Sequence, residues 1–118
     1  MNNFLETVLT RIGLAVIVID RNQRIRIWNT QARELWGLAA DEAEGNHLLS
    51  LDIGLPMEDL KPSLRAIFSG ASEREELVVD AVNRRGREFQ CQVTLVRLGQ
   101  ISDDGAAAAI MMSETDGA

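Results

Sequence analysis

The sequence predicts an α+β domain with a five-stranded antiparallel sheet and short helices packed on one face. Three observations predict it. Two segments with strand character lie near the amino end, three more lie in the second half, and an irregular insert with helical patterns separates the two groups. Strands joined by short turns pair antiparallel, and helices gathered between two groups of strands pack against the sheet that those strands form.

The amino-terminal region predicts a helix followed by a β-hairpin. Apolar residues recur at spacings of three and four between Phe4 and Ile12, which is typical of an amphipathic helix. The β-branched run Leu14–Ile19 favours a strand, and a turn signal separates it from a second strand at Arg24–Trp28.

Simple alternation places Trp28 on the polar face of this second strand. Ile25 and Ile27 would share one face, and Trp28 would share the other with two arginines. We therefore expect Trp28 to be covered by the amino-terminal helix or by a partner subunit.

Helix signals dominate the insert. Asn29 is expected to N-cap a helix that Gly37 ends, and Asp41–Ala43 is expected to form a short helical turn. A longer helix is expected to end at Gly70. Its apolar face is formed by Leu60, Leu64, Ile67 and Phe68.

Alternating patterns return in the second half. They predict two strands joined by a turn at Asn83–Arg87, and Ser102–Gly105 marks a second turn before a last strand at Ala107–Met112. The residues expected to share one face are Leu77, Val79 and Ala81 in the first of these strands and Phe89, Cys91, Val93 and Leu95 in the second.

The size, charge and apolar content of the chain argue against some classes of function. With 118 residues, 46% of them hydrophobic, the chain has the size of one domain. Its 12 Lys and Arg against 18 Asp and Glu give a net charge of −6, which disfavours binding to nucleic acid. No apolar run approaches the roughly 20 residues that cross a bilayer, so we expect no direct membrane contact. A single cysteine is compatible with a reducing compartment, and we expect the domain to be cytoplasmic.

One cysteine and one histidine exclude several kinds of site. Cys91 cannot form a disulfide within the chain, and no Cys or His pairs have metal-ligand spacing. A single histidine with scattered acids supplies no catalytic constellation. We therefore predict no catalytic residues and no metal ligands, and the chain is not expected to be an enzyme.

The order of elements and several residues resemble the PAS family over essentially the whole chain. A strand that ends in Asp20, a strand that ends in Trp28-Asn29 and a helix that closes on Gly37 are typical of PAS domains. The segment Asp80–Arg87 resembles the hairpin between their third and fourth strands. The resemblance implies a PAS-like five-stranded antiparallel sheet.

The resemblance also implies a domain organisation and a function. Residues 13–116 would form the PAS domain, preceded by an amphipathic helix at residues 1–12. Such a domain is a sensory and dimerisation module that relays ligand or partner binding to an effector domain elsewhere in a larger signalling protein. Leu51–Pro56 is similar to PAS modules of chemotaxis-type fusion proteins, which points to a histidine kinase or methyltransferase effector in a two-component system.

Two groups of residues are candidates for this role. We expect a homodimer formed through the amphipathic helix, because its apolar stripe needs cover; burial on the domain's own sheet is the alternative. The expected interface residues are Phe4, Leu5, Val8, Leu9 and Trp28. The expected residues for a small-molecule ligand of unknown identity are Trp36, His47, Ile67, Phe89, Cys91 and Met111.

Two other functions remain open. A sensor with bound haem or noncovalent flavin is the first, although Met57–Ser69 holds no histidine for haem. Covalent flavin photochemistry is not expected, because Gly45-Asn46-His47 stands where such a sensor has its cysteine. Core packing explains Trp36 and Cys91 without any cofactor. A small isomerase-like enzyme is the second, and it would need a buried carboxylate with a raised pKa.

Overall fold

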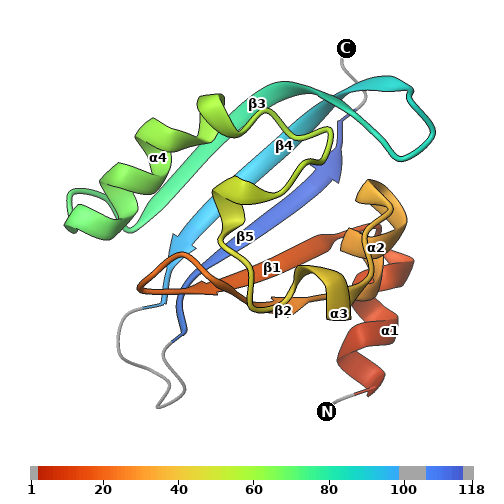
Figure 1. Ribbon diagram of the computed structural model, residues 1–118, viewed down its shortest axis with the longest axis horizontal. Coiled ribbons are helices and arrows are strands. Elements are labelled where there is room, and N and C mark those ends of the chain that lie inside the picture. The colour runs from red at the N-terminus through yellow and green to blue at the C-terminus, as the bar shows by residue number, and fades with distance from the viewer. Residues whose placement is uncertain (1–2, 99–105, 116–118) are drawn as a thin grey trace.

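The computed structural model describes residues 3–98 and 106–115 and confirms the predicted fold class. One antiparallel sheet with strand order β2-β1-β5-β4-β3 carries helices on one face (Figure 1). The elements are α1 (Asn3–Arg11), β1 (Ala15–Asp20), β2 (Ile25–Trp28), α2 (Thr30–Trp36), α3 (Ala40–Ala43), the 3-10 turn η1 (Leu48–Ser50), α4 (Met57–Ser69), β3 (Arg74–Val82), β4 (Glu88–Arg97) and β5 (Ala106–Glu114). We call the sheet face that α2 and α4 cover the inner face and the opposite one the outer face.

The hydrophobic core lies between the inner face and these helices. Val93 in β4 lies opposite Leu77 in β3 and Met112 in β5, so the alternation predicted for β3 and β4 is confirmed. The largest fully buried side chains include Ile17, Ile19, Ile25, Leu48, Leu60, Ile67, Val93, Leu95, Ile110 and Met112. Strands and helices therefore share one continuous core.

The predicted face of Trp28 is wrong. β1 and β2 pair through a β-bulge that leaves Arg26 without a direct partner, and this extra residue shifts the alternation of β2. Ile25 and Trp28 are therefore both buried, while Ile27 is exposed. Trp28 is 3% exposed and its Nε1 donates to the carbonyl oxygen of Leu38 at 2.7 Å. Its side chain has no surface left for a partner subunit to cover.

Helix α2 begins and ends as predicted. The Oδ1 of Asn29 accepts hydrogen bonds from the backbone N–H groups of Ala32 and Val16, each at 2.9 Å. Its Nδ2 donates to the carbonyl oxygen of Leu14 at 3.0 Å. Gly37 ends the helix in the left-handed conformation, with φ of 81°. Asn29 thus joins the start of α2 to the start of β1.

The other predicted elements are confirmed with small shifts. The helix that ends at Gly70 spans Met57–Ser69, and the turn at residues 83–87 joins β3 to β4. The last strand is longer than predicted and spans Ala106–Glu114. The predicted turn Ser102–Gly105 lies outside the described residues.

The loop before α4 contacts the last residue of β3. The backbone N–H of Val82 donates to the carbonyl oxygen of Gly54 at 2.9 Å. A Cβ atom on Gly54 would lie 2.6 Å from the carbonyl carbon of Val82, so only glycine permits the two backbones to approach this closely. The next residue, Leu55, is buried in the core and anchors the loop.

Candidate functional site

Four of the predicted ligand-binding residues lie together in the core. Ile67 on α4 and Cys91 on β4 are fully buried, and the ring centroids of Trp36 and Phe89 are 6.0 Å apart. Trp36, Ile67 and Cys91 belong to the buried cluster between the helices and the inner face, and the partly buried Phe89 packs against it. The structure shows their packing, and contact with a ligand stays a prediction.

Met111 lies on the outer face, so its predicted place in the ligand pocket is wrong. It pairs with Val16 on β1 and with Thr94 on β4, which alternate with the buried residues of those strands. Its neighbour Met112 takes the inner position and is fully buried. The sequence could not fix the phase of this strand, because alanine occupies every position from 106 to 109 and suits either face.

His47 caps the 3-10 turn η1. Its Nδ1 accepts a hydrogen bond from the backbone N–H of Leu49 at 3.2 Å, and its carbonyl oxygen accepts one from the Ser50 hydroxyl at 2.7 Å. Its backbone pairs with Arg24 in an isolated β-bridge. These contacts give the half-buried His47 a structural role, and a ligand contact through it stays a prediction.

The predicted interface stripe on α1 is largely exposed. Phe4 is 78% exposed, Ile12 just after the helix is 65% exposed and Val8 is 37% exposed. Leu9 is half-buried, and the side chain of Leu5 lies outside the described part of the chain. Helix α1 contacts α2. The domain's own sheet therefore does not cover the three exposed side chains.

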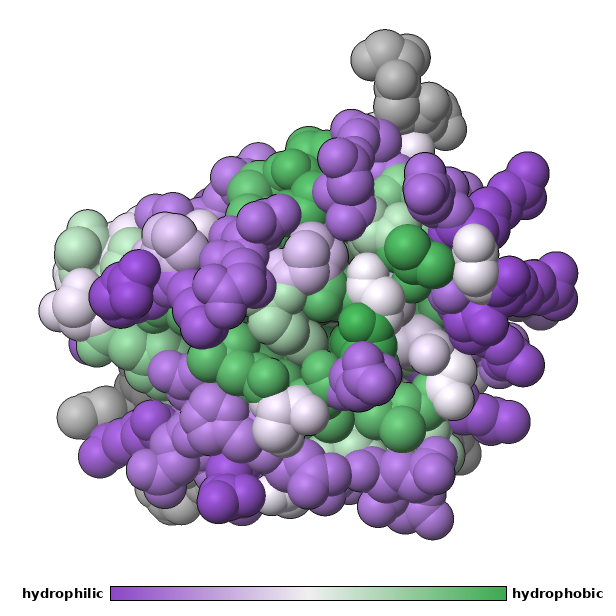
Figure 2. Space-filling view, turned by 45° about the horizontal axis from the view of Figure 1, so that its top comes forward, coloured by the Kyte–Doolittle hydropathy of each residue, from purple (hydrophilic) through white to green (hydrophobic). Residues whose placement is uncertain are grey.

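An open cleft that the sequence did not predict lies between α4, η1 and the β1–β2 turn. Its volume is about 420 Å³. Figure 2 shows hydrophobic side chains across the middle of the helix-covered side of the molecule, between hydrophilic regions. The cleft is lined by Gln23, Leu49, Lys61, Leu64, Arg65, Phe68 and Ser69.

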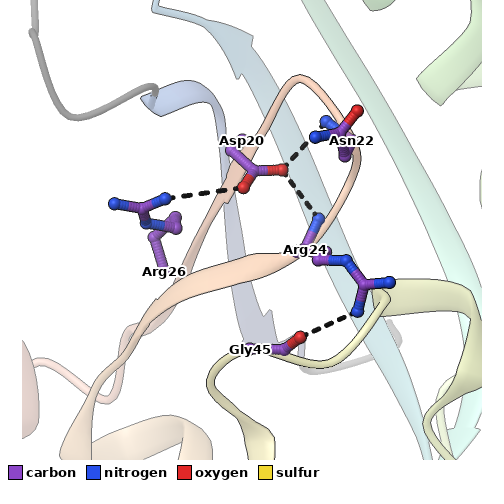
Figure 3. Close-up of polar contacts among 5 residues, drawn as sticks. All are labelled: Asp20, Asn22, Arg24, Arg26 and Gly45. Carbon is purple, nitrogen blue, oxygen red and sulfur yellow. Dashed lines mark hydrogen bonds and ion pairs between the residues drawn. The ribbon is translucent and has the colours of Figure 1, made fainter.

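Asp20 holds the turn that forms one wall of this cleft. Its Oδ1 accepts hydrogen bonds from the backbone N–H groups of Asn22 at 2.9 Å and Arg24 at 3.0 Å (Figure 3). Its Oδ2 lies 3.6 Å from a guanidinium nitrogen of Arg26. Arg24 in turn donates from Nη1 to the carbonyl oxygen of Gly45 at 3.0 Å. These contacts tie the turn to β2 and to the segment before η1.

Gln23 is the residue of this turn that lines the cleft. Its backbone is left-handed, with φ of 63°. Its N–H donates to the carbonyl oxygen of Asp20 at 2.9 Å, and its carbonyl oxygen accepts from the N–H of Leu48 at 2.8 Å. Its Oε1 is buried and forms no hydrogen bond with any described residue. Glycine or asparagine is usual in this conformation, so the sequence alone does not show that Gln23 adopts it.

Metal-binding groups and membrane helices were also sought in the described ranges. No three or more His, Cys, Asp or Glu side chains within residues 3–98 and 106–115 are arranged to hold a metal ion. None of the helices in these ranges has both the length and the apolar character that crossing a membrane requires.

Cys91 is expected to react slowly with thiol reagents in the native protein. Burial raises the pKa of its thiol from 9.0 to about 11, and the side chain is fully buried. Because the thiolate is the reactive form, 5,5′-dithiobis(2-nitrobenzoic acid) at about pH 8 should label the native protein at least ~100-fold more slowly than the urea-unfolded protein. Cys91 is the only cysteine, so the absorbance change reports on it alone. Equal rates would contradict this burial.

The same pKa shift gives a pH dependence of stability. The unfolded chain releases the thiol proton near its ordinary pKa of 9.0, whereas the folded chain holds it up to about 11. The folded state should therefore lose stability as the pH rises through this interval, and a Cys91→Ala variant should lack that part of the loss.

The arrangement of sheet and helices shows which class of domain this is. One antiparallel sheet, interrupted in sequence by a helical insert that covers its inner face, defines a small α+β domain. The family model of the PAS fold matches residues 3–112. The chain belongs to the PAS family.

Solved structures of PAS domains share this fold. The PAS domain of a protein from Colwellia psychrerythraea has a TM-score of 0.70 at 13% identity, with 96% of this chain and 95% of that chain covered. The PAS domain of nitrogen regulation protein NR(II) from Vibrio parahaemolyticus has a TM-score of 0.67 at 17% identity, with coverages of 97% and 100%. A PAS domain from a two-component sensor histidine kinase has a TM-score of 0.68 at 12% identity, with coverages of 96% and 95%.

Membership of the PAS family supports a general role in signal transduction. PAS domains are generally sensory modules of signal transduction rather than catalytic domains, and the matched model covers nearly the whole chain. Because the sequence identities to these solved structures are low, the structures show a similarity of fold only.

Proposed function

We propose that this domain is a sensory module of a larger signalling protein and that it works as a homodimer. The observation that carries the dimer is the exposed stripe Phe4, Val8 and Ile12, whose members lie four residues apart and so line one side of α1 and its end. Exposed apolar stripes of this kind are stabilised by burial against a partner. A second copy is the simplest partner, because a two-fold axis brings the same stripe from both chains together.

The connection from α1 to the sheet supports a route for the signal. The backbone N–H of Leu14 donates to the carbonyl oxygen of Leu9 at 2.9 Å, and that of Gly13 donates to Thr10 at 3.1 Å. Helix α1 therefore runs into β1 without a slack linker, and β1 lies between β2 and β5 in the sheet. A change in α1 packing would bias the sheet between two arrangements, and the reverse also holds.

The effector lies outside this domain in the proposed scheme. A histidine kinase or a methyltransferase in the parent protein is the kind of effector that we propose. Support comes from the PAS domain of a two-component sensor histidine kinase, which has the same fold.

The dimer is tested by removing the apolar stripe. In sedimentation velocity over a dilution series, the wild type should sediment as a dimer, and the double variant Phe4→Asp with Ile12→Asp should weaken self-association by about 100-fold or more. The reason is that both protomers lose two buried apolar side chains. Both positions are exposed in the single chain, so circular dichroism should show an unchanged fold.

The control changes charge without changing the stripe. Arg11→Glu alters the net charge by the same amount as the double variant and lies at an exposed position of α1. It should leave the dimer intact. A monomeric wild type, or a double variant that dimerises as tightly as the wild type, would refute the proposed interface.

A further inference from the structure

We infer that the free edge of β3, formed by the backbone groups of Glu76, Val78 and Asp80, binds an extended segment of a partner protein. In that segment two basic residues flank an apolar one. The inference goes beyond the proposed dimer, because β5 and β4 separate β3 from β1, the strand that follows α1 (Figure 1). The direction of the backbone groups and the charges beside Val78 carry it.

Alternate backbone groups of β3 point away from β4. The N–H of Asn83 donates to the carbonyl oxygen of Arg87 at 2.9 Å, so this residue pair is hydrogen-bonded. In the same antiparallel register, the odd-numbered residues of β3 are hydrogen-bonded to β4 and the even-numbered ones direct both backbone groups to the open edge. Val82 confirms this direction, because its N–H donates to the carbonyl oxygen of Gly54. This edge therefore already accepts one backbone group from outside the sheet.

Three successive outward-directed residues of β3 are unpaired. The N–H and C=O groups of Glu76, Val78 and Asp80 form no hydrogen bond with any residue in the described part of the chain. All three residues are exposed, and Val78 is 51% exposed. Helix α4 contacts β4 as well as β3, so it covers the inner face rather than the edge. An edge of this kind is a template for an added strand.

The charges along the edge disfavour a second copy of this chain as the added strand. Antiparallel pairing of two β3 strands about Val78 would place Glu76 of each copy directly opposite Asp80 of the other. Like charges directly opposite each other destabilise a strand pair. Lys or Arg at these two positions would make both contacts attractive, and an apolar residue between them would cover Val78.

Asp80 is the stronger of the two acidic anchors. Glu76 already forms an ion pair with Arg74 at 2.7 Å, whereas Asp80 accepts a hydrogen bond from the neutral Gln90 and has no ion pair with any described residue. Glu88 lines the same open hollow as Asp80 at the end of β3 and β4. A cation opposite Asp80 therefore meets a second carboxylate nearby.

The edge is tested by NMR titration of the ¹⁵N-labelled domain with the peptide TKTVTKT, acetylated and amidated at its ends. Its lysines would lie opposite Glu76 and Asp80 and its valine opposite Val78, while threonine favours the extended conformation. Saturable amide shifts are expected at residues 75–81, with a Kd on the order of 1 mM because a short flexible segment becomes ordered on binding. At about ten times this concentration, the three outward-directed amides should exchange about tenfold more slowly than in the free domain.

A matched peptide and three variants assign the contacts. The peptide TETVTET reverses the charges and should not saturate. Asp80→Asn removes the charge and keeps the oxygen that accepts from Gln90, so it should raise the Kd about threefold. Asp41→Asn, the same change at an exposed position of α3, should not alter the Kd. Val78→Pro removes the central free N–H without touching the hydrogen bonds to β4 and should abolish saturation.

Four results would overturn the inference. They are slow exchange of the amides of Glu76, Val78 and Asp80 in the dilute free domain, equal binding of the two peptides, equal effects of the two Asp→Asn changes, and slower exchange with rising protein concentration alone. The last result would make a second copy the occupant. The double variant Phe4→Asp with Ile12→Asp should bind TKTVTKT as the wild type does, so failure of this site is distinguishable from failure of the proposed dimer.

Discussion

Replacing Asn29 with alanine is expected to lower the free energy of unfolding by about 3–5 kcal/mol. Asn29 is buried and makes three side-chain hydrogen bonds, to the N–H groups of Val16 and Ala32 and to the carbonyl oxygen of Leu14. Alanine would leave three backbone groups without their partner and remove the N-cap of α2 at the same time. Urea unfolding followed by circular dichroism measures the loss.

Two control variants separate these contributions. Asn29→Asp keeps the oxygen that accepts from Val16 and Ala32 and replaces the donor to Leu14 with a carboxylate oxygen that this carbonyl repels, so the cap of α2 is retained while the link to Leu14 is lost. Asn46→Ala removes one hydrogen bond, from Nδ2 to the carbonyl oxygen of Glu42, at an exposed position and should cost less than about 1 kcal/mol. Equal losses for Asn29→Ala and Asn46→Ala would show that Asn29 does not join α2 to β1.

Helix ends could be predicted from the sequence because their signals are local. Asn29 at the start of α2, Gly37 at its end and Gly70 at the end of α4 each act through the backbone of their own turn. The side chains of β3 and β4 that face the core could also be predicted, because apolar and polar residues alternate along both strands without interruption. Local rules therefore carried most of the element order.

The phase of two strands could not be predicted because it depends on pairing. In β2 the bulge at Arg26 turns Trp28 from the expected outer face to the core. In β5 a run of alanines gives no alternation, and only the pairing with β1 and β4 shows that Met112, and not Met111, faces inward. A single residue of shift reverses every side chain of a strand.

The cleft could not be predicted because its walls come from three segments far apart in the sequence. Gln23 belongs to a hairpin turn, Leu49 to a 3-10 turn and Arg65 to the exposed side of a helix, and each is ordinary for its own element. Their proximity follows from the way α4 and the β1–β2 hairpin pack on the same core.

The close contact between the loop before α4 and the end of β3 gives a second large expected effect. Gly54→Ala should lower the free energy of unfolding by about 2–4 kcal/mol, because the new methyl group would overlap the carbonyl group of Val82. The loop would have to move away from β3, which breaks the hydrogen bond from Val82 N–H to Gly54 and lifts the buried Leu55 out of the core. Urea unfolding measures the loss of stability.

Amide hydrogen exchange and a variant of a second glycine show whether steric overlap with Val82 causes the loss of stability. In Gly54→Ala the amide of Val82 should lose its protection, because its acceptor has moved. Gly86→Ala places a methyl group in open space at φ of 78°, so it costs only the left-handed backbone strain of about 1 kcal/mol and should leave Val82 protected. If Val82 stays protected in Gly54→Ala and the stability changes by less than in Gly86→Ala, the loop does not depend on this close approach.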